Sequence, residues 1–261
     1  MYDQTPGVGR LIVAETSVSR RFRALVRAVW HYIIRAPLTY GWLLALAITT
    51  IVQNLLTGHQ LHSILLHRYT NIHALATDPL GVLFSSLLWI DGRSLEPYLL
   101  LFTIFLAPAE RWLGQLRWLS VGLSAHIIAT YVSEGLLYLA IEMRDANERY
   151  VRAHDIGVSY FMVGIIGVLT YRIARPWRWG YLGVLLLIFG FPVITMDRIG
   201  LDFTAIGHFA ALLVGLAFYP MTRERKRTPW DPAKYPAKLK EQFRSRKAPE
   251  ASTERRGASG G

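Results

Sequence analysis

The segment over residues 154–171 reads HDIGVSYFMVGIIGVLTY. After its polar start it is almost wholly apolar and long enough for a transmembrane helix. Ser159 lies near that polar-flanked start, and a second apolar segment, residues 203–219, carries His208 at about the same distance from its own polar flank. A serine and a histidine at matched depth in two membrane helices suggest a nucleophile and its general base.

Composition predicts an all-α polytopic membrane protein. Of the 261 residues, 52% are hydrophobic, and they gather in several runs of spanning length. Between the first two runs lies a mixed segment, about residues 57–97, whose own apolar run is too short to span. We therefore expect a long first loop that is partly embedded in the outer leaflet. The six expected spans are residues 38–56, 98–109 with a few flanking residues, 118–141, 156–173, 181–195 and 203–219.

The net charge of +11 lies entirely in the two ends of the chain. Residues 1–37 hold 6 Arg and Lys against 2 Asp and Glu, residues 222–261 hold 12 against 5, and residues 38–221 are balanced at 11 against 11. This division predicts a basic cytoplasmic segment with an amphipathic lead-in (1–37), a six-helix membrane domain (38–221) and a basic disordered cytoplasmic tail (222–261). Both tails would lie on anionic headgroups. No aromatic and basic platform accompanies the charge, so we expect no nucleic-acid partner.

Other features narrow the chemistry. The chain has no cysteine, which excludes disulfides, thiolate metal sites and cysteine nucleophiles. The first loop holds four histidines whose spacing fits no regular metal site, so we expect neither a metal nor a cofactor: His59, His62, His67 and His73. The first long apolar run follows an Arg-rich segment and no small-residue cleavage site follows it, which predicts an uncleaved first helix. Together with the short loops, this feature indicates a bacterial plasma membrane.

The candidate site can be placed in depth from the expected spans. Ser159 would lie about 6 Å and His208 about 9 Å below the outer face at 1.5 Å per residue, so their side chains could meet. The free N–H groups at the start of the Ser159 helix, Gly157 included, could hold an oxyanion. Glu134 in the third span is a candidate polar partner, whereas His126 in the same span is interpreted as structural. Serine in a membrane helix is also commonly a packing residue bonded to a backbone carbonyl.

Three segments in the same order resemble the rhomboid family of intramembrane serine proteases. The resemblance covers roughly residues 38–221 and implies a six-helix rhomboid-like bundle that cuts transmembrane protein substrates near their outer ends through an acyl-enzyme. It implies Ser159 as nucleophile, His208 as base, and Glu110 as a structural residue that braces the long first loop. The segments are Glu110 to Gly114 after the second span, Gly157-Val158-Ser159 in the fourth, and Gly207-His208 to Gly215 in the sixth.

The sequence departs from this family at three places. Tyr160 follows the serine where the family usually has glycine, and Val163 stands where an aromatic often stacks on the histidine. The family's oxyanion-assisting His and Asn positions correspond to Ser94 and Tyr98, whose hydroxyls could donate instead. Three interpretations follow from these residues: a divergent serine endopeptidase, a non-catalytic rhomboid-like pseudoprotease that binds or scaffolds membrane proteins, or an unrelated function such as a small transporter.

Overall fold

The structure, a computed structural model of the whole chain, describes residues 22–56, 72–90, 94–143, 157–195, 203–223 and 229–234. Within these residues the regular structure is helical, apart from one isolated β-bridge. Residues 22–34 are helical. The further elements are α2 (Pro37–Leu55), α4 (Ile72–Thr77), α5 (Pro79–Ser85), α6 (Glu96–Leu101), the π-helical turn η1 (Phe102–Leu106), α7 (Ala107–Leu113), α8 (Gln115–Glu142), α9 (Gly157–Leu169), the 3-10 turn η3 (Thr170–Arg172), α10 (Trp177–Ile194), α11 (Phe203–Ala217) and α12 (Tyr219–Thr222).

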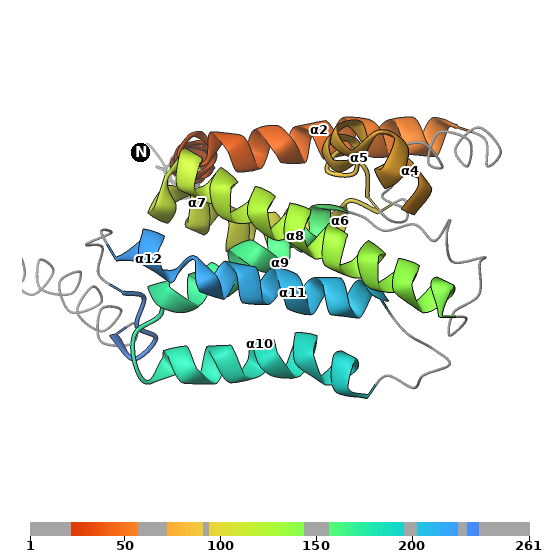
Figure 1. Cartoon of the computed structure of the whole chain (residues 1–261). Coiled ribbons are helices and arrows are strands. Elements are labelled where there is room, and N and C mark those ends of the chain that lie inside the picture. The colour runs from red at the N-terminus through yellow and green to blue at the C-terminus, as the bar shows by residue number, and fades with distance from the viewer. Residues whose placement is uncertain are drawn as a thin grey trace, which may run out of the picture.

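Three of these helices are long and apolar enough to cross a membrane: α2, α8 and α10. Two shorter apolar helices, α9 with η3 and α11, accompany them. The elements α6, η1 and α7 follow one another without a break from Glu96 to Leu113. In Figure 1 the long helices lie side by side along one direction, with α10 at one edge of the bundle and α2 at the opposite edge. The predicted all-helical membrane protein is confirmed in this form.

Local sequence explains where the helices begin and end. α2 begins with Pro37, whose missing N–H is not needed in the first helical turn. Gly114, at φ 84°, ends α7 and precedes α8, and this left-handed backbone conformation favours glycine. α10 begins at Trp177 rather than at the expected residue 181, with Pro176 at its N-cap position. The predicted short apolar run of the first loop contains α5, and α4 precedes it; neither helix is long enough to span.

α9 is the enclosed centre of the bundle. All of its residues except Ser159 and Met162 are buried, and its apolar residues point in every direction. Gly164 of α9 touches Gly215 of α11 so closely that a Cβ on Gly215 would lie 2.1 Å from the Gly164 carbonyl oxygen. Small residues therefore bring the two backbones together. α10 is the contrast, since only Leu185 and Gly190 are buried along its length.

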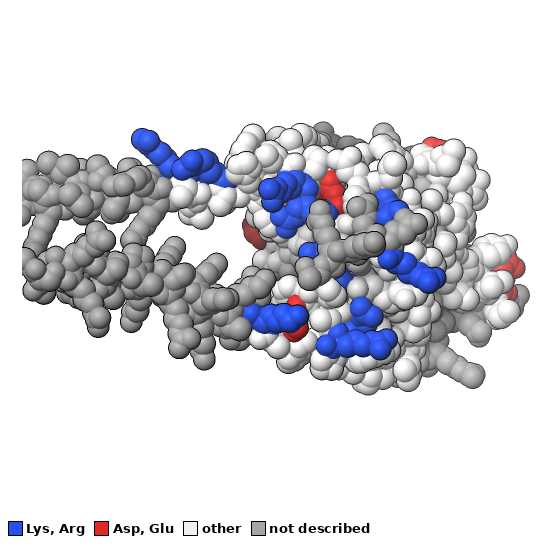
Figure 2. All heavy atoms as spheres, turned by 90° about the vertical axis from the view of Figure 1, so that its left-hand side faces the viewer, with Lys and Arg blue, Asp and Glu red and all other residues white. Residues whose placement is uncertain are grey.

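The basic residues gather at one end of the bundle. Figure 2 faces the end where α2 begins and shows Arg and Lys side chains spread over it. The described basic residues belong to the lead-in helix or flank helix ends on this side: Arg23, Arg27, Arg35, Arg111, Arg117, Arg172, Arg175, Arg178, Arg223 and Lys234. The helix over residues 22–34 also exposes Phe22, Leu25 and Trp30, which suits a membrane surface. Asp78, Glu96 and Glu142 belong to elements of the opposite end.

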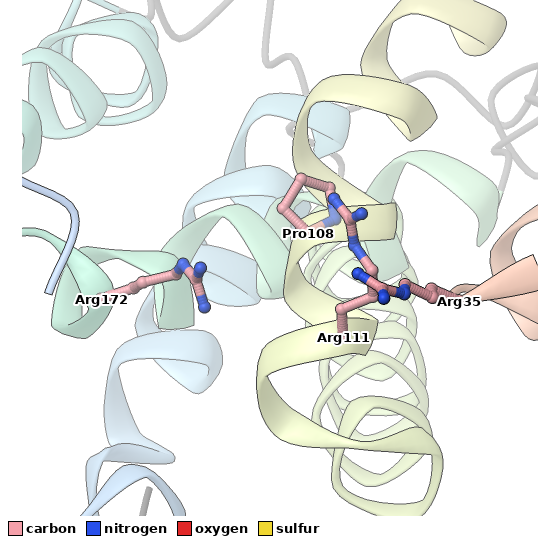
Figure 3. A pocket seen from close by; sticks show the side chains of 4 residues that line it. All are labelled: Arg35, Pro108, Arg111 and Arg172. Carbon is pink, nitrogen blue, oxygen red and sulfur yellow. The ribbon is translucent and has the colours of Figure 1, made fainter. Parts of the chain in front are cut away.

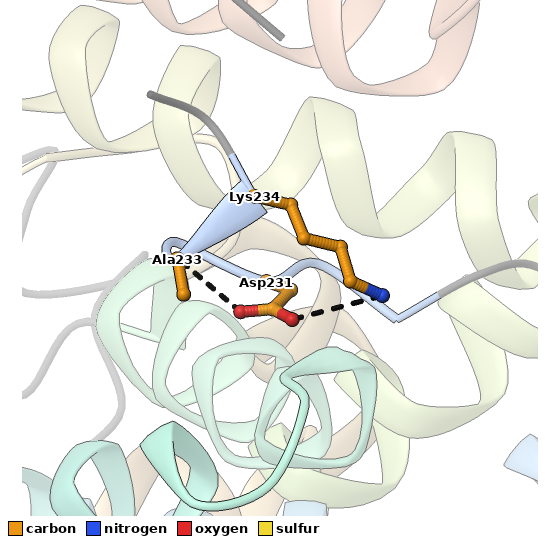
Figure 4. Close-up of polar contacts among 3 residues, drawn as sticks. All are labelled: Asp231, Ala233 and Lys234. Atoms are coloured by element: carbon orange, nitrogen blue, oxygen red, sulfur yellow. Dashed lines mark hydrogen bonds and ion pairs between the residues drawn. The ribbon is translucent and has the colours of Figure 1, made fainter. Parts of the chain in front are cut away.

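A short piece of the C-terminal tail contacts the bundle, which the sequence did not predict. Trp230 forms a parallel bridge with Ile173, its N–H donating to the Arg172 carbonyl and its carbonyl accepting from the Ala174 N–H, both at 2.9 Å. Asp231 then accepts a hydrogen bond from the Ala233 N–H at 3.1 Å and lies 3.8 Å from the Lys234 amine (Figure 4). Residues 229–234 are thus attached to the turn before α10.

Candidate active site between α9 and α11

Ser159 lies in the first described turn of α9 and is half-buried. The backbone N–H groups of a helix's first turn have no partner within the helix, and the positive end of the helix dipole lies there. Ser159 and Met162 are the two residues of α9 that are not buried, although the helix itself is enclosed by the bundle.

His208 lies in the second turn of α11 and is also half-buried. Its imidazole packs edge-on against the Tyr160 ring, with centroids 5.1 Å apart and an interplanar angle of 70°. On its other side it lies 6.0 Å from the ring of Phe189 in α10. His208 therefore stands where α9, α10 and α11 meet. The structure brings it against the residue that immediately follows Ser159.

Tyr160 fills the space between α9 and α11 beside His208 and Gly207. Its ring is fully buried, and its hydroxyl is so close to Gly207 that a Cβ there would lie 2.2 Å from the phenolic oxygen. The aromatic contact with the histidine thus comes from Tyr160, one residue after the serine, rather than from position 163. Val163 packs in the apolar cluster that includes Ala211 and Leu212. The glycine before the histidine is required because Tyr160 fills the space beside it.

Gly157 is placed against a histidine that the sequence analysis treated as structural. A Cβ on Gly157 would lie 2.1 Å from Cε1 of His126 and 2.7 Å from Oγ of Ser86. His126 is buried, and its Nε2 lies 3.0 Å from the Leu83 carbonyl and 3.4 Å from the Ser86 hydroxyl. The contacts of His126 therefore join the first loop to α8 beside Gly157 of α9. This proximity could not be predicted from the sequence, because it depends on the relative depth of two helices.

The two hydroxyl candidates for oxyanion support belong to the start of the second span. Ser94 is exposed and donates a hydrogen bond to the Glu96 carboxylate. Tyr98 packs its ring against Phe102, with centroids 6.5 Å apart, at the edge of the core cluster that contains Trp118. The Ser94 hydroxyl is thus held at the exposed start of α6.

Glu110 is a buried cap of α2. Its carboxylate accepts hydrogen bonds from the Leu38 N–H at 3.0 Å, the Thr39 N–H at 2.8 Å and the Thr39 hydroxyl at 2.7 Å. The resemblance implied that Glu110 braces the long first loop. Its described bonds instead brace the first turn of α2, where free N–H groups and the helix dipole favour a negative charge. This end of α2 is the basic end of the bundle, whereas α9 begins farther toward the other end (Figure 1).

Glu134 is buried on the part of α8 that meets the start of α11. Its neighbour Ser133 donates to the carbonyl of Phe203, the first residue of α11, at 2.9 Å. The acidic group is therefore on the same side of the bundle as His208. The loop histidines His59, His62 and His67 and the side chain of His73 lie outside the described residues.

The fold and the site define a membrane protein with polar side chains enclosed between closely packed helices. A family model described as "Rhomboid-like protein" matches residues 31–228, and the chain therefore belongs to the rhomboid-like family. This match confirms the resemblance that the sequence motifs suggested. No curated protein and no solved structure matches the chain significantly.

Proposed function

We propose that the chain is an intramembrane serine endopeptidase that cleaves transmembrane segments near the outer membrane face. Ser159 is the nucleophile and His208 its general base. The observation that carries this proposal is the packing of His208 on Tyr160, which brings the histidine to the turn of α9 that holds the serine. A serine hydroxyl needs an imidazole within reach, because it is a weak nucleophile until its proton is taken up.

The reaction uses groups that this chain provides. The imidazole of His208 takes the Ser159 proton as the oxygen attacks the scissile carbonyl. N–H groups at the start of α9, from Gly157 onward, donate to the negative oxygen of the tetrahedral intermediate. Collapse of the intermediate breaks the C–N bond, and the imidazolium returns its proton to the leaving amine. A water then hydrolyses the acyl-enzyme with His208 again acting as base.

We place the protein in the bacterial plasma membrane with six spans and both termini in the cytoplasm. The six would be α2, α6 to α7, α8, α9 with η3, α10 and α11. The grouping of the described Arg and Lys residues at one end supports this orientation. From the expected spans, Ser159 would lie about 6 Å below the outer face, which suits cleavage within the bilayer.

A second candidate function is a rhomboid-like pseudoprotease that binds transmembrane clients without cutting them. The burial of Tyr160 favours it, because the ring occupies space beside His208 that a substrate backbone would need. The hydrogen bond of Ser94 to Glu96 favours it too, since that hydroxyl is already engaged.

Labelling with a fluorophosphonate separates the two candidates. Purified, lipid-reconstituted wild type should react, Ser159→Ala should not, and His208→Ala should react at least about a hundredfold more slowly because it lacks the base. Ser120→Ala is the matched control, since this hydroxyl is exposed on α8 and bonded to the Leu116 carbonyl. If wild type is folded and remains unlabelled, the endopeptidase proposal fails and client binding becomes the better description.

A further inference from the structure

Three arginines surround one cavity at the basic end of the bundle. The cavity has a volume of about 500 Å³ and is lined by Arg35, Pro108, Arg111 and Arg172. These arginines come from three places in the chain: the residue after the lead-in helix, α7 and η3. Figure 3 shows Arg35 and Arg111 side by side, with Arg172 reaching toward them from across the cavity. The fold therefore collects three guanidinium groups around one space.

Aromatic rings hold two of these guanidinium groups in place. Arg111 lies over the Tyr32 ring, with its Cζ 3.9 Å from the centroid, and Cζ of Arg172 lies 5.7 Å from the Trp112 ring. Both arginines are half-buried. Burial raises the pKa of the Tyr32 hydroxyl, although Arg111 opposes the shift, so the phenol stays neutral and leaves the arginine charge in place. The arginines are thus positioned before any ligand arrives.

The acidic residue next to this cavity already accepts hydrogen bonds from α2. Glu110 precedes Arg111 in sequence, but its two oxygens accept hydrogen bonds from Leu38 and Thr39 of α2. The described lining of the cavity is cationic and contains no carboxylate. An anion placed between guanidinium groups gathered in this way is attracted by all of them at once.

We infer that this cavity binds a phosphate group, most directly that of an anionic phospholipid headgroup. Guanidinium groups match phosphate oxygens through paired, charge-assisted hydrogen bonds. The cavity lies at the end of the bundle where the helices meet the headgroup layer, and basic pockets between membrane helices are suited to such headgroups. A soluble phosphate ester carries the same group and is the alternative source of the bound phosphate. This phosphate site does not involve Ser159 or His208. The inference therefore applies to either of the two proposed functions.

Native mass spectrometry of the full chain in neutral detergent micelles tests the site. Dioleoyl phosphatidylglycerol, dioleoyl phosphatidylcholine and inorganic phosphate are the three probes, and neutral micelles remove the general attraction of a charged membrane. The pocket variant combines Arg35→Gln, Arg111→Gln and Arg172→Gln. Its matched control combines Arg23→Gln, Arg27→Gln and Arg175→Gln, which removes the same charge from exposed positions at the same end. Arg35→Glu alone is a milder variant, because this side chain is exposed and its change should leave folding intact.

Wild type and control should retain one phosphatidylglycerol in preference to phosphatidylcholine. The pocket variant should bind it on the order of a hundredfold more weakly, and Arg35→Glu at least about tenfold more weakly. If inorganic phosphate binds instead, and the pocket variant loses it, the phosphate site stands and its natural ligand is soluble. The inference is overturned if pocket and control variants lose binding equally, if Arg35→Glu binds like wild type, or if wild type shows no preference for either anionic probe.

Discussion

Replacing Gly215 by alanine should force α9 and α11 apart. The added Cβ would lie 2.1 Å from the Gly164 carbonyl oxygen, about 1.3 Å closer than an ordinary 3.4 Å contact, and 3.0 Å from the Gly164 Cα. Both obstacles are backbone atoms of α9, so no side chain can rotate away. Overpacking of this kind costs about 1–3 kcal/mol. We expect the upper part of that range, or more, because the strain falls on the most enclosed helix of the bundle.

The control for this prediction is Gly183→Ala in α10. Gly183 is exposed and a Cβ there would meet nothing within 4 Å, so alanine should stabilise the helix by up to about 1 kcal/mol. In detergent micelles, thermal unfolding of Gly215→Ala should shift Tm down by roughly 5–10 °C, and Gly183→Ala should leave Tm unchanged or slightly raised. A Gly215→Ala protein as stable as wild type would refute the close contact of the two helices.

Three other changes test single contacts. Glu110→Ala removes the three bonds that cap α2 and should cost about 3 kcal/mol or more in the free energy of unfolding, whereas Glu96→Ala at an exposed site should cost less than about 0.5; equal losses in denaturant titrations would contradict the cap. Gly157→Ala should cost about 1–3 kcal/mol by displacing His126, and hydrogen exchange should rise at residues 83–86 as well as in α9; unchanged exchange in the loop would show that the two are not coupled. Tyr160→Phe keeps the ring beside His208 and should cost about 1 kcal/mol, while Tyr160→Ala opens a cavity and should cost about 3–5; similar Tm values for the two would argue against the ring contact.

Helix positions could be predicted from the sequence because apolar runs alternate with charged flanks. The bounds of α2 and α8 fall within a few residues of those expected, since Pro37 and Gly114 mark the starts. The π-helical turn η1 could not be predicted in this way. It lies just before Pro108, which cannot donate a helical hydrogen bond, and a wide turn accommodates such a local fault without breaking the helix.

The candidate site was predictable only in part. Depth along each span placed Ser159 and His208 near one another, because every helical residue advances by a fixed rise. The rotation of each helix about its own axis is set by packing, and this is why the contact between Tyr160 and His208 was not foreseen. For the same reason the family resemblance points to the first loop as the partner of Glu110, whereas its carboxylate accepts hydrogen bonds from α2.

The bridge between Trp230 and Ile173 has a consequence for the order in which the chain assembles. Trp230 belongs to a segment that the ribosome makes after every helix of the bundle, yet it supplies two hydrogen bonds to the turn between η3 and α10. That turn cannot be completed during insertion of α10. These two hydrogen bonds can form only after the tail has been synthesised and has folded back onto the turn. In the proposed orientation, this last step takes place on the cytoplasmic side. Shortening the chain before residue 229 would remove these two hydrogen bonds while the described helices from α2 to α12 are still present.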